Sequence, residues 1–67
     1  MTTGIIKMWD VERGYGFILS DDHAADVFCH AKSLIGASEL TPGAAVEFLP
    51  VFDQGRGKYQ ATDVRVI

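Results

Sequence analysis

The sequence predicts an all-β domain built from five short strands. Turn signals recur along the chain, and the runs between them are short and rich in β-branched and aromatic residues. Five such runs within 67 residues are typical of a barrel or a sandwich. We expect strands at residues 3–10, 14–20, 25–30, 44–52 and 58–66.

The turns separate these strands in order. Glu-Arg-Gly at 12–14 divides the first strand from the second, and Ser-Asp-Asp at 20–22 divides the second from the third. Thr-Pro-Gly at 41–43 precedes the fourth strand, and Asp-Gln-Gly at 53–55 divides the fourth from the fifth. Each turn contains residues that favour a reversal of the chain.

Two stretches depart from this pattern. Residues 31–40 have some helical character, but they are too few and contain a glycine, so a single helical turn near 32–34 is expected. Pro50 falls inside the fourth strand, where it cannot donate a hydrogen bond to a neighbour. Its presence predicts a sheet edge or a bulge at that point.

Length and composition limit the class of protein. A chain of 67 residues has room for one hydrophobic core, so residues 1–67 form one domain. The chain is 48% hydrophobic and 22% charged, which favours a folded globule over a disordered segment. Deep substrate pockets need more chain, and no nucleophile and base stand at a recognisable spacing. The sequence therefore gives no case for an enzyme.

Aromatic residues gather in the second and third strands. Since side chains alternate between the faces of a strand, Tyr15 and Phe17 share one face, and Phe28 and His30 share one face. An aliphatic set is available to fill the interior instead, which places these four side chains together on the outside; we call them the aromatic platform. The expected core comprises Ile6, Ile18, Val27, Cys29, Leu34, Val46, Phe48, Ala61 and Val64.

An exposed aromatic patch favours a ligand that covers it. A single aromatic residue in a strand more often belongs to the core, but four on one face reverse that expectation. Nucleobases suit such a patch, because every base has a π-face and each stacked base contributes about 1–3 kcal/mol. The platform therefore predicts binding of single-stranded RNA or DNA.

The charges give a mixed signal. A net charge of −3 counts against a nucleic-acid partner, since most such proteins are basic. However, Lys7 and Arg13 lie near the aromatic strands, and Arg56 and Lys58 lie in a glycine-rich turn. A local positive groove could meet phosphates, with weak affinity and strong salt sensitivity.

At these residues the chain resembles the cold-shock domain family over nearly its whole length. Arg-Gly-Tyr-Gly-Phe-Ile at 13–18 matches the family's first ribonucleoprotein motif, and Val-Phe-Cys-His at 27–30 matches the second. Gly-Ile-Ile-Lys at 4–7 resembles the opening strand. The order of the two motifs distinguishes the family from the RNA-recognition motif. Leu40, Gly43, Val46, Phe48, Gln60, Ala61 and Val64 fit the remainder.

The resemblance implies a five-stranded antiparallel OB-fold barrel that binds single strands of RNA or DNA with little sequence demand, often favouring pyrimidines. Family members act as RNA chaperones, and some as antiterminators, so a role in regulating transcription or translation is implied. The implied contacts are Lys7, Tyr15, Phe17, Phe28 and His30, with Arg13 and Arg56 close to the sugar–phosphate backbone of the nucleic acid. We also expect Lys58 in the binding site, because it lies beside Arg56 in the basic turn.

The chain also departs from the family pattern. Lys-Trp-Phe-Asn of the family reads Lys-Met-Trp-Asp at 7–10, so Met8 takes the place of the stacking Trp. Trp9 then points to the other face unless a bulge turns it outward. Ala31 replaces a frequent aromatic, and the loop at 35–39 has none. These departures predict weaker binding or a shorter footprint than in a typical member.

Other readings are weaker. Cys29, His30 and His23 do not make a metal site, because neighbouring strand residues point apart and structural zinc takes four ligands. We expect no metal and no cofactor. Cys29 is the only cysteine, so an intrachain disulfide is impossible. We expect neither a signal peptide nor a membrane segment, which favours the cytoplasm. We also expect a monomer. The alternative function is a protein-interaction barrel that uses the same apolar patch.

Overall fold

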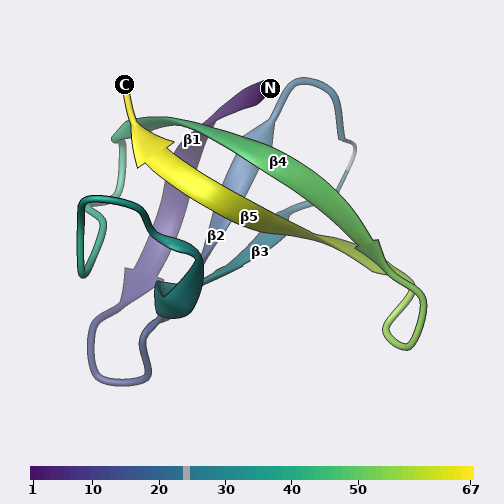
Figure 1. The fold of residues 1–67 in the computed structure, drawn as a ribbon, viewed down its shortest axis with the longest axis horizontal. Helices are drawn as coiled ribbons and strands as arrows, with labels where there is room; N and C mark the ends of the chain where they lie inside the picture. Colours follow the sequence, from purple (N-terminus) through teal and green to yellow (C-terminus); the bar gives the residue numbers. More distant parts are fainter. Residues whose placement is uncertain (24) are drawn as a thin grey trace.

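The computed structural model describes residues 1–23 and 25–67, and its five strands close into a barrel in the order β1-β2-β3-β5-β4 (Figure 1). This confirms the predicted fold class, and the strands begin and end close to the expected positions. The elements are β1 (Thr2–Asp10), β2 (Tyr15–Ser20), β3 (Val27–His30), the 3-10 helix η1 (Ala31–Ser33), β4 (Ala45–Asp53) and β5 (Lys58–Val66).

The pairing is antiparallel at four of the five junctions between strands, and parallel where β3 meets β5. The predicted five-stranded antiparallel barrel is confirmed, and this junction is the one exception to its antiparallel pairing. Strands that alternate in direction cannot close a ring with an odd number of members, so one parallel pair is required. Phe28 and Gln60 form this parallel pair, and a bridge between Leu34 and Val64 continues it.

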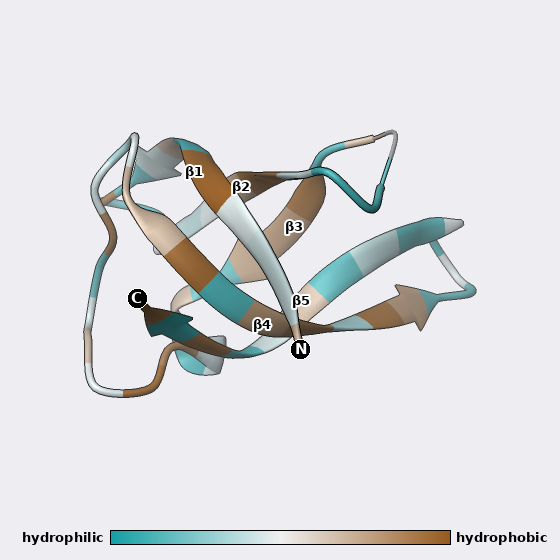
Figure 2. Ribbon diagram, turned by 90° about the horizontal axis from the view of Figure 1, so that it is seen from above, coloured by the Kyte–Doolittle hydropathy of each residue, from teal (hydrophilic) through white to brown (hydrophobic). Residues whose placement is uncertain are grey.

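The core lies inside the barrel and is built from one face of each strand. The predicted core is confirmed at every position except Leu34, which is half buried and packs against the outside of the cluster. Leu40 takes its place in the core, with 6% of its surface exposed. Hydrophobic residues occur along all the strands, whereas Asp21, Asp22 and His23, which follow β2, are hydrophilic (Figure 2).

Beyond the barrel, β4 and β5 continue as a projecting hairpin (Figure 1). Phe48 is the last residue of β4 that pairs with β1, and the register of β4 against β5 shifts between Glu47 and Leu49. Pro50 follows this shift and pairs only with Ala61 of β5. The predicted edge or bulge at Pro50 is therefore confirmed.

The turn of this hairpin is held by Asp53. Its Oδ1 accepts hydrogen bonds from the backbone N–H groups of Gly55 and Arg56, at 3.0 and 3.3 Å. Gly57 has a φ of 67°, a conformation in which glycine is strongly favoured. Within the described residues, no helix is long and apolar enough to cross a membrane.

Candidate nucleic-acid interface

The four residues of the aromatic platform lie together on the outer face of β2 and β3. Tyr15 pairs with His30 across the two strands, and Phe17 pairs with Phe28. The ring of Phe28 is at the centre of the group, with centroids 5.7 Å from Tyr15, 5.9 Å from Phe17 and 6.5 Å from His30. All four side chains are partly exposed and stand outside the core. The predicted alternation of the two strands thus produces a continuous aromatic surface.

β1 approaches β2 closely at Gly16, on the side of β2 that faces the core. Gly16 lies between the two platform residues of β2 and is buried. A Cβ atom added there would collide with the carbonyl oxygen of Met8 and the indole of Trp9. Position 16 therefore has to be glycine for β1 to pack as it does.

A bulge in β1 decides how Met8 and Trp9 are placed. The register against β2 shifts between Ile6 and Met8, so Met8 lies opposite Phe17 and Trp9 lies opposite Gly16. Residues that oppose each other across antiparallel strands share a face, so Met8 joins the platform side, where it is 36% exposed. Trp9 instead packs against the core. The bulge turns Met8 outward rather than Trp9.

Three of the predicted cations already have carboxylate partners. The Nζ of Lys7 is 2.9 Å from Asp26, and the Nε of Arg13 is 4.0 Å from Asp10. These pairs are exposed, so each stabilises the fold by only about 0–1 kcal/mol and a phosphate can compete for the cation.

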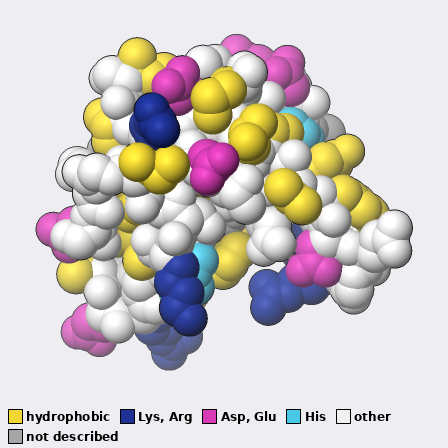
Figure 3. Space-filling view, in the orientation of Figure 1, with side chains coloured by type: hydrophobic (Ala, Val, Ile, Leu, Met, Phe, Trp, Pro, Cys, Tyr) yellow, Lys and Arg dark blue, Asp and Glu magenta, His cyan; other side chains and the backbone are white. Residues whose placement is uncertain are grey.

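The third pair lies at the hairpin turn. The Nε of Arg56 is 3.8 Å from Asp53, and its guanidinium carbon is 5.5 Å from the centre of the Phe28 ring. That distance is within the range of a cation–π contact, so Arg56 lies at the edge of the platform. In Figure 3, Lys and Arg side chains lie on both sides of a hollow at the lower edge of the molecule.

His30 has a fixed ring orientation. Its Nδ1 accepts a hydrogen bond of 3.1 Å from the backbone N–H of Lys32, at the start of η1. In the neutral ring the proton is therefore on Nε2, which can donate to a ligand. The predicted helical turn thus serves to orient a platform residue.

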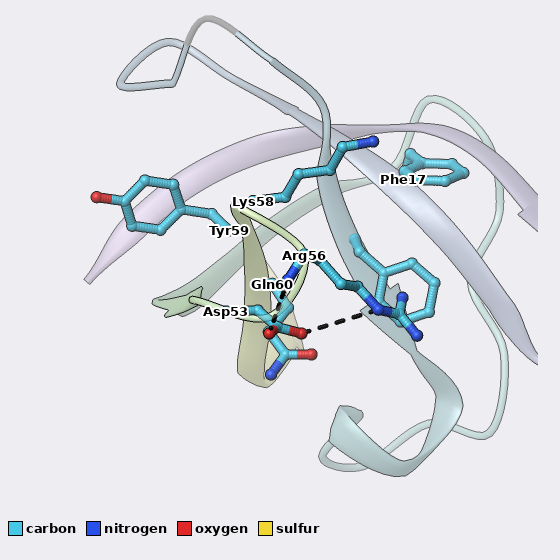
Figure 4. A pocket seen from close by; sticks show the side chains of 7 residues that line it. Phe17, Asp53, Arg56, Lys58, Tyr59 and Gln60 are labelled. Carbon is cyan, nitrogen blue, oxygen red and sulfur yellow. Dashed lines mark hydrogen bonds and ion pairs between the residues drawn. The ribbon is translucent and has the colours of Figure 1, made fainter.

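An open depression of about 300 Å³ adjoins the platform (Figure 4). Its lining contains aromatic rings, two cations and the side-chain amide of Gln60. In Figure 4, Lys58 extends from the hairpin toward Phe17, and Arg56 lies beside Asp53. The depression combines apolar surface with hydrogen-bonding groups, which suits a planar polar ligand such as a base. It is lined by Phe17, Phe28, Asp53, Arg56, Lys58, Tyr59 and Gln60.

Sequence reasoning missed Tyr59 and Phe52. These residues pair across the hairpin, and their ring centroids are 5.2 Å apart. They are 41% and 48% exposed, and the ring of His23 is 4.5 Å from Tyr59. The available signal was two aromatic residues at similar distances on either side of a glycine-rich turn, which predicts a cross-strand pair.

Metal and thiol chemistry find no support among the described residues. No group of three or more His, Cys, Asp or Glu side chains there is arranged to hold a metal ion. Cys29 is fully buried in the core, and its burial raises the pKa of the thiol to about 11. A thiol with so high a pKa is a poor nucleophile at neutral pH.

Taken together, a closed five-stranded barrel with ring-bearing side chains and cations on one outer face defines an OB-fold domain of the nucleic-acid-binding type. The model of the "'Cold-shock' DNA-binding domain" family matches residues 2–67. The chain belongs to this family.

Known proteins agree with this assignment. The chain is 36% identical to the probable cold shock protein y4cH of Sinorhizobium fredii and 37% identical to the cold shock protein CspA of Rhizobium meliloti, with 97% of each chain covered in both cases. It is 39% identical to the cold shock-like protein CspA of Stigmatella aurantiaca, covering 100% of this chain and 98% of that one.

A solved structure, described as Drosophila Unr CSD456, superposes with a TM-score of 0.79 over 98% of this chain. The chain spans 26% of that structure's length. At 21% sequence identity this likeness concerns the fold alone.

Proposed function

We propose that this domain binds single-stranded RNA or DNA by stacking bases on the aromatic platform. The observation that carries the proposal is the contact of Phe28 with the rings of Tyr15 and Phe17 outside a core that is complete without them. A ring cluster exposed to water is costly unless a ligand covers it. Stacking requires no particular base, because every base has a π-face. It therefore suits a protein that binds single-stranded nucleic acid of many sequences.

Few side chains are placed to contact the phosphates of the bound nucleic acid. Lys7, Arg13 and Arg56 meet phosphates by exchanging their carboxylate partners, and Lys58 reaches over the depression beside the platform. His30 donates from Nε2. With a net charge of −3, the domain binds more weakly than a basic relative would, and Met8 offers less stacking surface than an aromatic ring.

The biological role that fits this chemistry is that of an RNA chaperone or a regulator of transcription or translation. Binding to unpaired bases favours the melted form of a hairpin, because a ligand stabilises the state to which it binds. The domain works as a cytoplasmic monomer, without metal, cofactor or catalytic activity. Its relatives are named as cold shock proteins, which supports the proposal.

A titration at two salt concentrations tests the function. A fluorescently labelled pyrimidine-rich oligonucleotide is titrated with the domain, and anisotropy gives the affinity. We expect affinity to fall with salt, by about 0.7 in log K per log unit of salt for each phosphate contacted. A protein-interaction barrel that uses the same patch would instead show no oligonucleotide binding and an association that barely responds to salt.

A further inference from the structure

A second group of rings lies on the hairpin, separate from the platform. His23, Tyr59 and Phe52 form a row, with ring centroids 4.5 Å apart for the first pair and 5.2 Å apart for the second. We call these three residues the hairpin cluster. Tyr59 and Phe52 lie outside the core and are among the largest exposed apolar side chains of the described residues.

Two neighbouring depressions lie between the platform and the hairpin cluster, and they share two lining residues. The depression beside the platform is lined by Phe17 and Phe28, and also by Lys58 and Tyr59. A second depression of about 230 Å³, between the β2–β3 connection and the hairpin, is lined by His23 and again by Lys58 and Tyr59. Both depressions share Lys58 and Tyr59. A single strand of RNA or DNA that lies on the platform can therefore pass Lys58 and reach the hairpin cluster.

The side chains along this path have distinct roles. In Figure 4, Lys58 points toward Phe17, whereas the ring of Tyr59 points away from it, to the other side of the hairpin. Lys58 can therefore hold a phosphate between the two sites. Asp22 and Asp26 line the second depression, and their charge disfavours a phosphate there. The chemistry of the cluster suits an uncharged base with its sugar–phosphate turned to the solvent.

We propose that Tyr59 and Phe52 form an additional base-stacking site, which takes a nucleotide of the same strand that covers the platform. The proposal rests on the proposed function and extends it. It also reverses one expectation from the sequence: the footprint is lengthened on the hairpin side, although Ala31 and the loop at 35–39 provide no ring at the other end. A cross-strand pair that only stabilised the hairpin would leave oligonucleotide binding unchanged when its rings are removed.

Oligonucleotide length separates the two sites. Oligothymidylates of about four and about eight nucleotides fall within the roughly 4–16 nucleotides that one such barrel covers. Tyr59→Leu and Phe52→Leu keep an apolar side chain and remove the π-face. We expect each variant to bind the short oligomer like the parent, and the long oligomer about fivefold or more weakly. Leu49 lies on β4, as Phe52 does, and is 43% exposed. Leu49→Ala is therefore the matched control and should leave the affinities for both oligomers unchanged.

The outcomes are distinguishable. Equal affinity of parent and variants for the long oligomer overturns the additional site but leaves the platform intact. Equal weakening for both lengths also overturns it, because the residues would then act through the fold or the platform. If the parent binds neither oligomer, the proposed function fails, and the additional site fails with it.

Discussion

Met8 lies directly opposite Phe17, because β1 contains a bulge between Ile6 and Met8. This places a flexible thioether at the edge of the aromatic platform, with Trp9 turned against the core. A ring at position 8 would lie next to Phe17 without disturbing the packing of Trp9.

Replacement of Met8 by tryptophan should therefore strengthen binding. The added ring gives another stacking surface, and we expect affinity for a pyrimidine-rich oligomer to rise by about 1 kcal/mol or more. Met8→Leu, which keeps the size and adds no ring, is the control. Affinity of Met8→Trp at or below that of the parent would show that position 8 does not contact the strand.

Gly16 should not tolerate a side chain. The Cβ of Gly16→Ala would collide with the backbone of Met8 and with Trp9, so we expect a loss of stability of about 1–3 kcal/mol in chemical denaturation. In Gly55→Ala the Cβ would meet only the carboxylate of Asp53, which can move. A Gly16→Ala variant as stable as Gly55→Ala would contradict the close packing of β1 on β2.

Removal of the Asp53 charge should make Arg56 available to phosphate. Asp53→Asn keeps the Oδ1 acceptor that holds the turn and removes the charge beside Arg56. We expect affinity for the oligonucleotide to rise about two- to threefold at low salt. The slope of log K against log salt concentration should become steeper by at most about 0.7. Asp63→Asn, which changes net charge equally, should have a smaller effect. Equal gains in the two variants would indicate a general charge effect.

Cys29 should make the fold sensitive to alkali. Its pKa is raised from 9.0 to about 11 because ionisation in the core is unfavourable, so the unfolded chain loses this proton first. The contribution of the neutral thiol to the free energy of unfolding is fully present below pH 9. It is lost as the pH rises toward 11, and the loss is on the order of 2 kcal/mol. Denaturation midpoints of the parent and of Cys29→Val, measured across this range, test the effect. If both proteins lose stability in parallel, the thiol is not responsible.

The sequence was sufficient for the strands and the core, because alternation of side chains along Tyr15–Ser20 and Val27–His30 has one consistent solution. It could not decide the orientation of Trp9, since a bulge of one residue reverses the faces and leaves no mark in local composition. The place of Leu40 in the core depended on how the loop after η1 folds back, which is a tertiary effect.

Other features of the site depended on the closure of the barrel. The partners of Lys7 and Arg56 and the groove between Phe17 and Tyr59 arise where distant segments meet. Tyr59 falls within the predicted strand at 58–66, but its place on a hairpin that projects beyond the barrel follows from the topology. Charge counting alone likewise could not show that the cations beside the platform already have carboxylate partners.

The measurement that tests the platform most directly is oligonucleotide affinity of Phe17→Ala and Phe28→Ala, with thermal unfolding of both variants. Because the rings lie outside the core, we predict that each variant stays folded and loses about 1–3 kcal/mol of affinity. Leu19→Ala, on the outer face of the same strand as Phe17 and 48% exposed, should bind like the parent. Folded Phe17→Ala and Phe28→Ala variants that bind as tightly as the parent would contradict the account.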